Sequence, residues 1–283
     1  MPSPTTAALF PGQGTDVAGL REETAGLRPD LVLLLDDVAG AGAGADAFAR
    51  STESTRFAQP AIVCVTLSRW SVLPHPAAGA VLGHSLGEIT ALAAAGVLTE
   101  GDAIRLAARR GALMDEAGAV GDPGGMTALL KGSVDEVAAL AARHGLTVAN
   151  DNAPGQVVVS GSLRRLEALE ADAPGAGLRA IRLAVSGAFH SPAMAPAREA
   201  FAEAIAAVEL APASIPVWSS ISASPMHDPA TALVDALERP VLFRESLLAL
   251  REAGISAFFD AGPGDVLSGM VRRTLPDRAT THA

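Results

Sequence analysis

A serine between two glycines, in Gly83-His84-Ser85-Leu86-Gly87-Glu88, is the first feature of the sequence that points to chemistry. The apolar run Ala77 to Leu82 precedes it and the alanine-rich run Ile89 to Leu98 follows, which predicts a strand, a sharp turn and a helix. A serine on such a turn has a strained backbone and an exposed hydroxyl, as a nucleophile requires. Both glycines are expected because a Cβ there would collide with the strand and the helix. The N–H of Leu86, at the helix start, is then free to stabilise an oxyanion.

A serine hydroxyl is a poor nucleophile at neutral pH and needs a base within hydrogen-bond reach, usually a histidine. Of the six histidines, His190 is favoured because its loop, Ser186 to Pro192, lies where the chain passes between the two domains predicted below. His84 adjoins the serine, and we expect its side chain to point away from Ser85. The others are expected in a proline-flanked loop (His75), at a helix cap (His144), in a polar loop (His227) and in a frayed tail (His282).

Two other segments carry polar side chains that could contact a ligand. The predicted strand Thr6 to Phe10 runs into Pro11-Gly12-Gln13-Gly14, and loops at the carboxyl ends of strands contact ligands in open α/β sheets, so Gln13 is a candidate. The predicted helix Leu98 to Ala117 carries Arg109 and Arg110 side by side. Adjacent helical residues point about 100° apart, so one arginine is expected to face inward and the other solvent.

Composition indicates an ordinary globular protein. The chain has 283 residues, 49% of them hydrophobic, and a net charge of −10, which argues against nonspecific binding of nucleic acid. Lys131 is the only lysine, and Cys64, the only cysteine, lies in an apolar run, so no internal disulfide is expected. No basic leader and no apolar run long enough to span a bilayer is evident, and we expect a cytoplasmic protein. No Cys/His cluster has metal-site spacing, so we expect no metal and no cofactor.

The glycine-rich stretch Gly118 to Gly125 divides the chain. After it, the hydrophobic pattern predicts a strand, helix, strand, strand, helix and strand at 126–130, 134–144, 146–150, 156–160, 163–172 and 178–185. This βαββαβ order is that of a ferredoxin-like unit, which can be inserted into a larger domain. We therefore predict an α/β chain with residues 1–123 and 187–283 in a large catalytic domain and residues 124–186 in a small one.

In the large domain, helices are expected at 31–38, 56–70, 98–117, 194–208, 230–237 and 243–253, and strands at 6–10, 77–82, 215–220 and 255–260. Residues 39–49, rich in alanine and glycine, are expected to form a loose connection. Pro60 falls near the start of its helix, where proline is tolerated.

Several motifs in a fixed order resemble one protein family. They are Phe10-Pro11-Gly12-Gln13-Gly14, Gln59-Pro60-Ala61, the serine motif, Arg110-Gly111, Asn152 with Pro154-Gly155-Gln156-Val157-Val158, Phe189-His190-Ser191 and Gly262-Pro263-Gly264. Together the motifs look like those of a malonyl-CoA:acyl carrier protein transacylase, or of the discrete acyltransferase of a trans-acyltransferase polyketide synthase. The resemblance covers the chain from about Leu9 to Arg273. It implies an α/β-hydrolase-like large domain with a ferredoxin-like insert.

The resemblance also implies roles for individual residues. Ser85 would be the acylated nucleophile, His190 its base oriented by main-chain carbonyls, and the N–H groups of Gln13 and Leu86 the oxyanion hole. Arg110 would pair with the free carboxylate of a malonyl group, because a guanidinium fork suits a carboxylate. His84, Asn152 and Phe189 would complete the substrate-binding site. The implied reaction is ping-pong transfer of malonyl from coenzyme A to the phosphopantetheine thiol of an acyl carrier protein.

Selectivity and docking are less defined by the motifs. Phe189 resembles malonyl-selective members, whereas Gly187 replaces the histidine that begins this motif elsewhere, and Thr15, Asp16 and Ile89 also depart from the family pattern. Carrier proteins are typically acidic, so a local basic patch is needed on this acidic chain. The candidates are Arg164, Arg165, Arg272 and Arg273.

Four rival functions fit parts of the same pattern. Editing hydrolysis of acyl carriers, or transfer of another acyl group between carriers, would have less need of Arg110. A noncatalytic docking subunit would have no need of Ser85 and His190. A lipase or esterase is disfavoured because no acid followed by histidine with suitable spacing stands out after Ser85. The sequence does not separate fatty-acid from polyketide supply.

Overall fold

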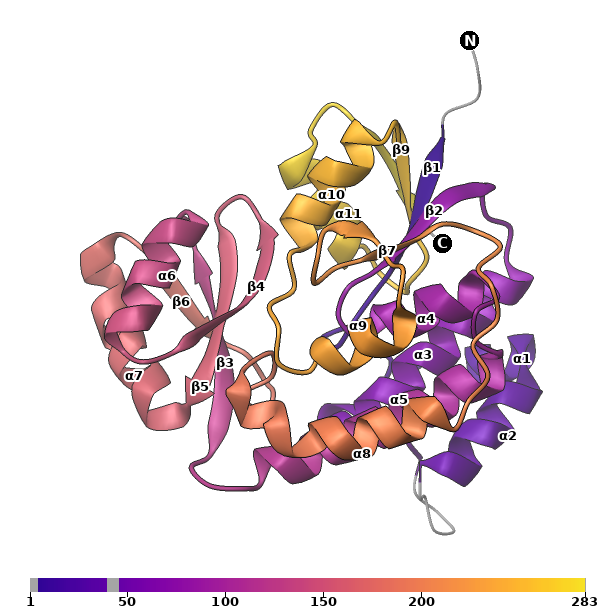
Figure 1. Cartoon of the computed structure of the whole chain (residues 1–283), viewed down its shortest axis with the longest axis horizontal. Coiled ribbons are helices and arrows are strands. Elements are labelled where there is room, and N and C mark those ends of the chain that lie inside the picture. The colour runs from indigo at the N-terminus through magenta and orange to yellow at the C-terminus, as the bar shows by residue number, and fades with distance from the viewer. Residues whose placement is uncertain (1–4, 40–45, 283) are drawn as a thin grey trace.

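Two β-sheets, each covered by helices, organise the computed structural model, which describes residues 5–39 and 46–282 (Figure 1). The six-stranded sheet has the order β10-β9-β1-β2-β7-β8, and all its pairs are parallel except β7 with β8. Its strands are β1 (Thr6–Phe10), β2 (Ala78–Gly83), β7 (Val217–Ser219), β8 (Ser224–Pro225), β9 (Ala257–Asp260) and β10 (Ala279–His282).

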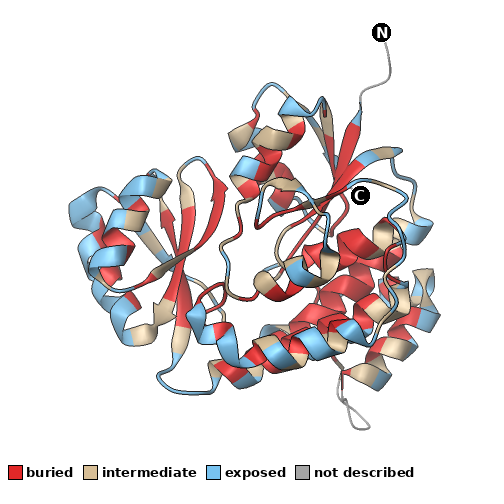
Figure 2. Cartoon of the chain, in the orientation of Figure 1, coloured by how far each residue is buried: buried red, intermediate tan, exposed pale blue. Residues whose placement is uncertain are grey.

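The central strand β1 shows why this sheet forms. All of its residues are buried, as is typical of a parallel strand with helices on both faces. Ala8 and Phe10 belong to the core beneath α3, α4 and α5, whereas Ala7 and Leu9 belong to the core beneath α10 and α11. Figure 2 shows this buried centre between helices that are exposed only on their outer sides.

The helices of this larger unit have the following bounds: α1 (Arg21–Leu27), α2 (Pro29–Val38), α3 (Thr55–Val72), α4 (Gly87–Ala94), α5 (Glu100–Gly118), α8 (Ala195–Ala206), α9 (Pro229–Asp235), α10 (Phe243–Glu252) and α11 (Val266–Thr274). Short 3₁₀ turns lie at η1 (Ala49–Thr52), η2 (Ala173–Ala176) and η3 (Pro192–Met194). Among the described residues, no helix is long and apolar enough to cross a membrane.

The four-stranded sheet has the order β4-β5-β3-β6 and is antiparallel throughout. It comprises β3 (Gly124–Leu130), β4 (Thr147–Ala153), β5 (Gln156–Ser162) and β6 (Arg179–Arg182), with α6 (Val134–Arg143) and α7 (Leu163–Asp172). Alternation along β5 sends Val157 and Val159 toward α6 and α7, and Val158 toward the core of the larger unit. The predicted βαββαβ order of elements is confirmed.

The two units are joined beside the serine turn. The N–H of Asp151 in β4 donates to the carbonyl of Val241, and the N–H of Val241 donates to the carbonyl of Ala149. The carboxylate of Asp151, almost fully buried, accepts two-pronged hydrogen bonds from Arg244 on α10 at 2.7–3.0 Å. The last residues of β4 are therefore fixed against the larger unit.

Several sequence predictions were wrong in detail. His282 pairs with Asp260 in β10 instead of fraying, because the open edge of β9 offers backbone groups to pair with. Helix α1 was not predicted, since seven residues carry too little periodicity to detect. Pro60 lies well inside α3, and β6 ends at Arg182 instead of residue 185. The predicted loose connection at 39–49 includes residues 40–45, which lie outside the described residues.

Candidate active site

The serine motif forms the predicted strand, turn and helix between β2 and α4. Ser85 has φ 53°, the left-handed region that an L-residue seldom adopts. A Cβ on Gly83 would overlap the backbone of Gly87 and Glu88, and one on Gly87 would overlap the carbonyl of Phe10 at the end of β1. The tight turn therefore depends on both glycines, for the reason expected from the sequence.

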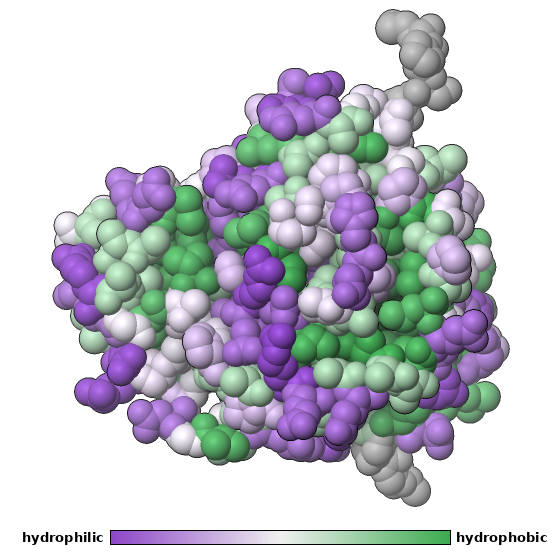
Figure 3. All heavy atoms as spheres, in the orientation of Figure 1, coloured by the Kyte–Doolittle hydropathy of each residue, from purple (hydrophilic) through white to green (hydrophobic). Residues whose placement is uncertain are grey.

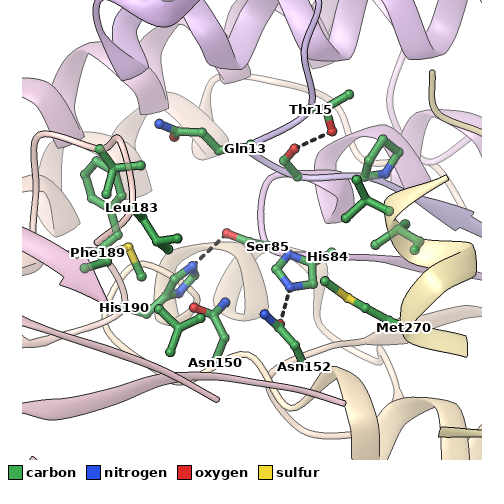
Figure 4. A pocket seen from close by; sticks show the side chains of 18 of the residues that line it. Gln13, Thr15, His84, Ser85, Asn150, Asn152, Leu183, Phe189, His190 and Met270 are labelled. Atoms are coloured by element: carbon green, nitrogen blue, oxygen red, sulfur yellow. Dashed lines mark hydrogen bonds between the residues drawn. The ribbon is translucent and has the colours of Figure 1, made fainter. Parts of the chain in front are cut away.

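The hydroxyl of Ser85 donates to His190 Nε2 at an Oγ–Nε2 distance of 2.8 Å (Figure 4). The other ring nitrogen, Nδ1, lies 3.1 Å from the carbonyl oxygen of Arg239. A carbonyl only accepts, so Nδ1 carries the proton and Nε2 has the lone pair that can take the serine proton. His190 itself has φ 56°, so both members of the pair occupy strained backbone positions.

Electrostatics keep this histidine in its neutral form. Burial lowers the pKa of His190 to about 3, and the positive charge of the neighbouring Arg110 acts in the same direction. The side chain is only 3% exposed. The imidazole is therefore a free base at neutral pH, ready to accept the proton of Ser85.

Arg110 lies on the inner side of α5, and its neighbour Arg109 faces solvent, as the sequence predicts for two adjacent arginines on a helix. Arg110 Nη1 donates to Gln59 Oε1 at 2.9 Å, and Arg110 Nη2 donates to Ser85 Oγ at 3.4 Å. Burial lowers the pKa of Arg110 to about 10, opposed by the charge of Glu88, so the guanidinium is still charged at neutral pH. A cation thus lies directly beside the hydroxyl of Ser85.

These groups line one cavity of about 260 Å³ between the two units. Figure 4 shows Ser85, His190 and His84 facing it, with Asn150 and Asn152 from β4 below them and Gln13 from the β1 loop above. The remaining wall is largely apolar and includes Met114, Met126, Val158, Leu183, Val185, Phe189 and Met270. The cavity joins a serine hydroxyl, a neutral imidazole and a buried cation to an apolar wall.

Comparison with known proteins gives the family. The acyl transferase domain model matches residues 9–282. This chain belongs to the acyl transferase family. The malonyl CoA-acyl carrier protein transacylase of Mycobacterium tuberculosis is 39% identical over 288 residues, covering 95% of this chain and 93% of that one.

Two further matches extend the comparison of this acyl transferase. The polyketide biosynthesis protein ThaF of Burkholderia thailandensis is 34% identical over 285 residues; the match covers 96% of this chain but only 24% of ThaF. The solved complex of a type II PKS acyl-carrier protein with its malonyl-transacylase matches with a TM-score of 0.87 at 28% identity, covering 99% of this chain and 95% of that one. The mixed α/β fold is therefore shared with solved malonyl-transacylases.

Within this acyl transferase, the other predicted site residues lie close to Ser85. Gln13 lines the cavity, and its side-chain Oε1 accepts from the hydroxyl of Thr55 at 2.7 Å. Leu86 is buried at the start of α4, where the N–H groups of Gly87, Glu88 and Ile89 already donate to carbonyls of the turn. The N–H groups of Gln13 and Leu86 remain our prediction for the oxyanion hole.

His84 turns its ring toward the small unit. Its Nε2 lies 2.7 Å from Asn152 Oδ1, and burial lowers its pKa, so the ring is neutral and Nε2 donates (Figure 4). Asn152 is fixed in β4, which is itself tied to the segment that contains Val241. His84 and Asn152 therefore connect the serine turn with β4 instead of presenting a second base to Ser85.

Sequence reasoning missed two buried residues of the site. Gln59, in a motif to which no role was given, holds the guanidinium of Arg110. Glu88, the last residue of the serine motif, accepts hydrogen bonds through Oε1 from the N–H and hydroxyl of Ser220 at 2.6 and 3.0 Å and from the hydroxyl of Ser219. Burial raises the pKa of Glu88 to about 7. Their signals in the sequence were membership of two of the quoted motifs and a polar side chain next to apolar residues.

The four arginines suggested for carrier docking are exposed, on α7 and α11. Three of them donate within their own surroundings: Arg165 to the carbonyl of Gly145, Arg272 to Asp265 and Arg273 to the carbonyl of Gly269. The face drawn in Figure 3 mixes hydrophilic and apolar side chains. Carrier docking at these arginines stays a prediction.

Proposed function

We propose that this acyltransferase moves a malonyl group from malonyl-CoA to the phosphopantetheine thiol of an acyl carrier protein through an acyl-Ser85 intermediate. The observation that carries the proposal is the 3.4 Å separation of the buried Arg110 guanidinium from Ser85 Oγ. In a malonyl group bound by Arg110 through its carboxylate, a single methylene separates the carboxylate from the thioester carbonyl, which therefore lies within reach of the Ser85 hydroxyl. A carboxylate is the acyl feature that a buried cation at this place would select.

The reaction has two half-reactions. Ser85 Oγ attacks the thioester carbon while His190 Nε2 takes the serine proton, and coenzyme A leaves as the thiol after receiving that proton. The carrier-bound thiol then attacks the malonyl-serine ester, giving its proton through His190 to Ser85 as the ester bond breaks. We place the N–H groups of Gln13 and Leu86 at the carbonyl oxygen in both tetrahedral intermediates. The proposed chemistry needs no cofactor besides its two substrates, malonyl-CoA and the phosphopantetheine thiol of the carrier protein.

Phe189 bears on the choice of acyl group. Its ring is 4% exposed and lies on the wall of the cavity beside His190 (Figure 4). A Cβ on Gly187 would collide with this ring. The ring can therefore lie where it does because residue 187, which departs from the family pattern, is a glycine. We therefore propose selectivity for malonyl over methylmalonyl, because the ring leaves little room for a substituent on the α-carbon.

We also infer the finer fold type. The order β4-β5-β3-β6 within a βαββαβ chain is the arrangement of ferredoxin-like folds, and the serine turn between a parallel strand and a helix is that of α/β hydrolases. The domain limits of 1–123 with 187–283 and of 124–186 stay a prediction, as does the cytoplasmic location.

Intact-protein mass spectrometry tests the proposal. Brief exposure to malonyl-CoA should add one malonyl group to the wild type and none to Ser85→Ala. Addition of a holo acyl carrier protein should then move that group to the carrier faster than water removes it. If the adduct forms but only water discharges it, editing hydrolysis is the better reading. If no malonyl adduct forms while an acyl group passes from one carrier to another, transfer between carriers replaces the proposal.

A further inference from the structure

A directed chain of hydrogen bonds joins Arg110 to Gln13 through the interior. Arg110 Nη1 donates to Gln59 Oε1 at 2.9 Å, Gln59 Nε2 donates to Thr55 Oγ1 at 2.8 Å, and Thr55 Oγ1 donates to Gln13 Oε1 at 2.7 Å. The direction is fixed at its start because a guanidinium can only donate. Gln59 must present its oxygen to Arg110 and therefore its NH₂ to Thr55. The hydroxyl of Thr55, once it accepts, donates its single proton to Gln13.

The middle of this chain is buried. Gln59 is 0% and Thr55 2% exposed, so water cannot replace a hydrogen bond that is lost there. Without the Thr55 hydroxyl, Gln59 Nε2 retains the sulfur of Met114 at 3.3 Å, a weak acceptor. A buried amide N–H that has only such a weak acceptor makes the orientation of Gln59 that holds Arg110 less stable.

The backbone around Thr55 is equally constrained. Thr55 is the first residue of α3, and the preceding Ser54 caps the helix by accepting from the N–H of Arg56. Helix α5 passes so close that a Cβ on Gly111 would come within 2.6 Å of the Thr55 carbonyl. Arg110 is thus carried on a helix that packs closely against the backbone of Thr55.

We propose that Thr55 is a positioning residue that holds the carboxylate-binding arginine and the oxyanion loop in one fixed arrangement. This inference rests on the proposed function, because it assigns Arg110 to the acyl carboxylate and the Gln13 N–H to the carbonyl oxygen. In malonyl a single methylene separates the carboxylate from the thioester carbonyl. The Arg110 guanidinium and the Gln13 N–H, which would bind these two groups, must therefore stay at a set separation. The Thr55 hydroxyl is the link between them that neither touches substrate nor titrates.

Valine and serine substitutions separate the hydroxyl from the shape of the side chain. Thr55→Val has nearly the same volume and branching but can neither accept from Gln59 nor donate to Gln13. Thr55→Ser keeps the hydroxyl and loses one methyl group. Leaving a buried polar partner unsatisfied corresponds to a loss of about ten- to a hundredfold in rate.

The test is quenched-flow measurement of malonyl-Ser85 formation over a range of malonyl-CoA concentrations. In Thr55→Val we expect the maximal rate to fall at least about tenfold and the half-saturating concentration to rise, whereas Thr55→Ser should stay within about twofold of the wild type on both. Gln13→Met, which keeps the backbone N–H, should lower the maximal rate as Thr55→Val does. The double variant should be no slower than Thr55→Val alone, since Thr55→Val already removes the bond that Gln13→Met removes.

Three results would overturn the proposal. One is a folded Thr55→Val protein whose two constants lie within about twofold of the wild type. Another is a Thr55→Ser protein as slow as Thr55→Val, which would indicate packing instead of hydrogen bonding. If Thr55→Val does not fold, an unimpaired Gln13→Met decides against it and an impaired one supports it. If the wild type forms no malonyl adduct at all, the proposed function is overturned and this inference with it. The wild-type reaction alone therefore distinguishes failure of the proposed function from failure of the role of Thr55.

Discussion

Replacing Arg110 tests the assignment of the acyl carboxylate most directly. In Arg110→Ala the cavity loses its only described cation beside Ser85, and Gln59 loses the donor to its Oε1. Removing one partner of a buried charge pair costs about 3–5 kcal/mol, equivalent to about 150- to 5,000-fold in rate. The cavity is open to incoming substrate, so we expect a value near the lower end, about a hundredfold or more, for malonyl loading.

Acetyl-CoA provides the internal reference, because an acetyl group has no carboxylate for Arg110 to bind. We expect Arg110→Ala to lower the ratio of malonyl to acetyl loading of Ser85, measured by intact-protein mass spectrometry in a timed mixture of the two thioesters. Arg109→Ala is the matched control, since Arg109 adjoins Arg110 on the same helix but is exposed, and its ratio should equal that of the wild type.

Two side effects must be separated from the loss of the carboxylate contact. Arg110 helps to lower the pKa of His190 and balances the charge of Glu88, so its removal can also slow acetyl loading and reduce stability. Both effects act on the two thioesters alike and therefore cancel in the ratio. A malonyl-to-acetyl ratio unchanged in a folded Arg110→Ala protein would refute the role of Arg110.

The remaining predictions concern pH, acyl selectivity and the serine turn. Because the pKa of His190 is lowered to about 3, its base form persists as pH falls. The acylation rate is measured in Glu88→Gln, which removes the carboxyl group with a pKa of about 7, and should show no loss near pH 6.5. A loss there would mean that His190 titrates as an ordinary histidine. Since the pKa of Arg110 is lowered to about 10, half-saturating malonyl-CoA should rise as pH passes through 10, and a flat profile there would contradict its carboxylate role. Phe189→Ala should raise the ratio of methylmalonyl to malonyl loading about tenfold in the same mass assay, and no change would show that the ring does not limit the α-carbon. Gly87→Ala, whose Cβ would meet the Phe10 carbonyl, should lower the free energy of unfolding in urea by about 2–3 kcal/mol. Gly26→Ala in α1, whose Cβ would have nothing within 4 Å, should raise that free energy by about 0.5–1 kcal/mol. Equal effects of the two substitutions would refute the steric account.

Much of the architecture is predictable because it is encoded in short-range patterns. The apolar run of β1 and the glycines around Ser85 predict a buried strand and a tight turn from local sterics and hydrophobic periodicity alone. The order of elements after Gly125 follows in the same way. Short or edge elements escape such reasoning, as α1 and β10 show, because their stability comes from the neighbours they pack or pair with.

The sequence by itself determined that Ser85 lies on a strained turn, that one of two adjacent arginines faces inward, and that the motifs belong together in one family. The family resemblance in the sequence already assigned Arg110 and His190. Only the tertiary structure decided that both side chains lie within 3.4 Å of Ser85 Oγ and that Gln59 and Thr55 connect Arg110 to Gln13. The physical reason is the range of the interactions. Turn sterics and helix periodicity act within a few residues, whereas buried hydrogen bonds and the lowered pKa of His190 exist only once packing has removed water from segments distant in the chain.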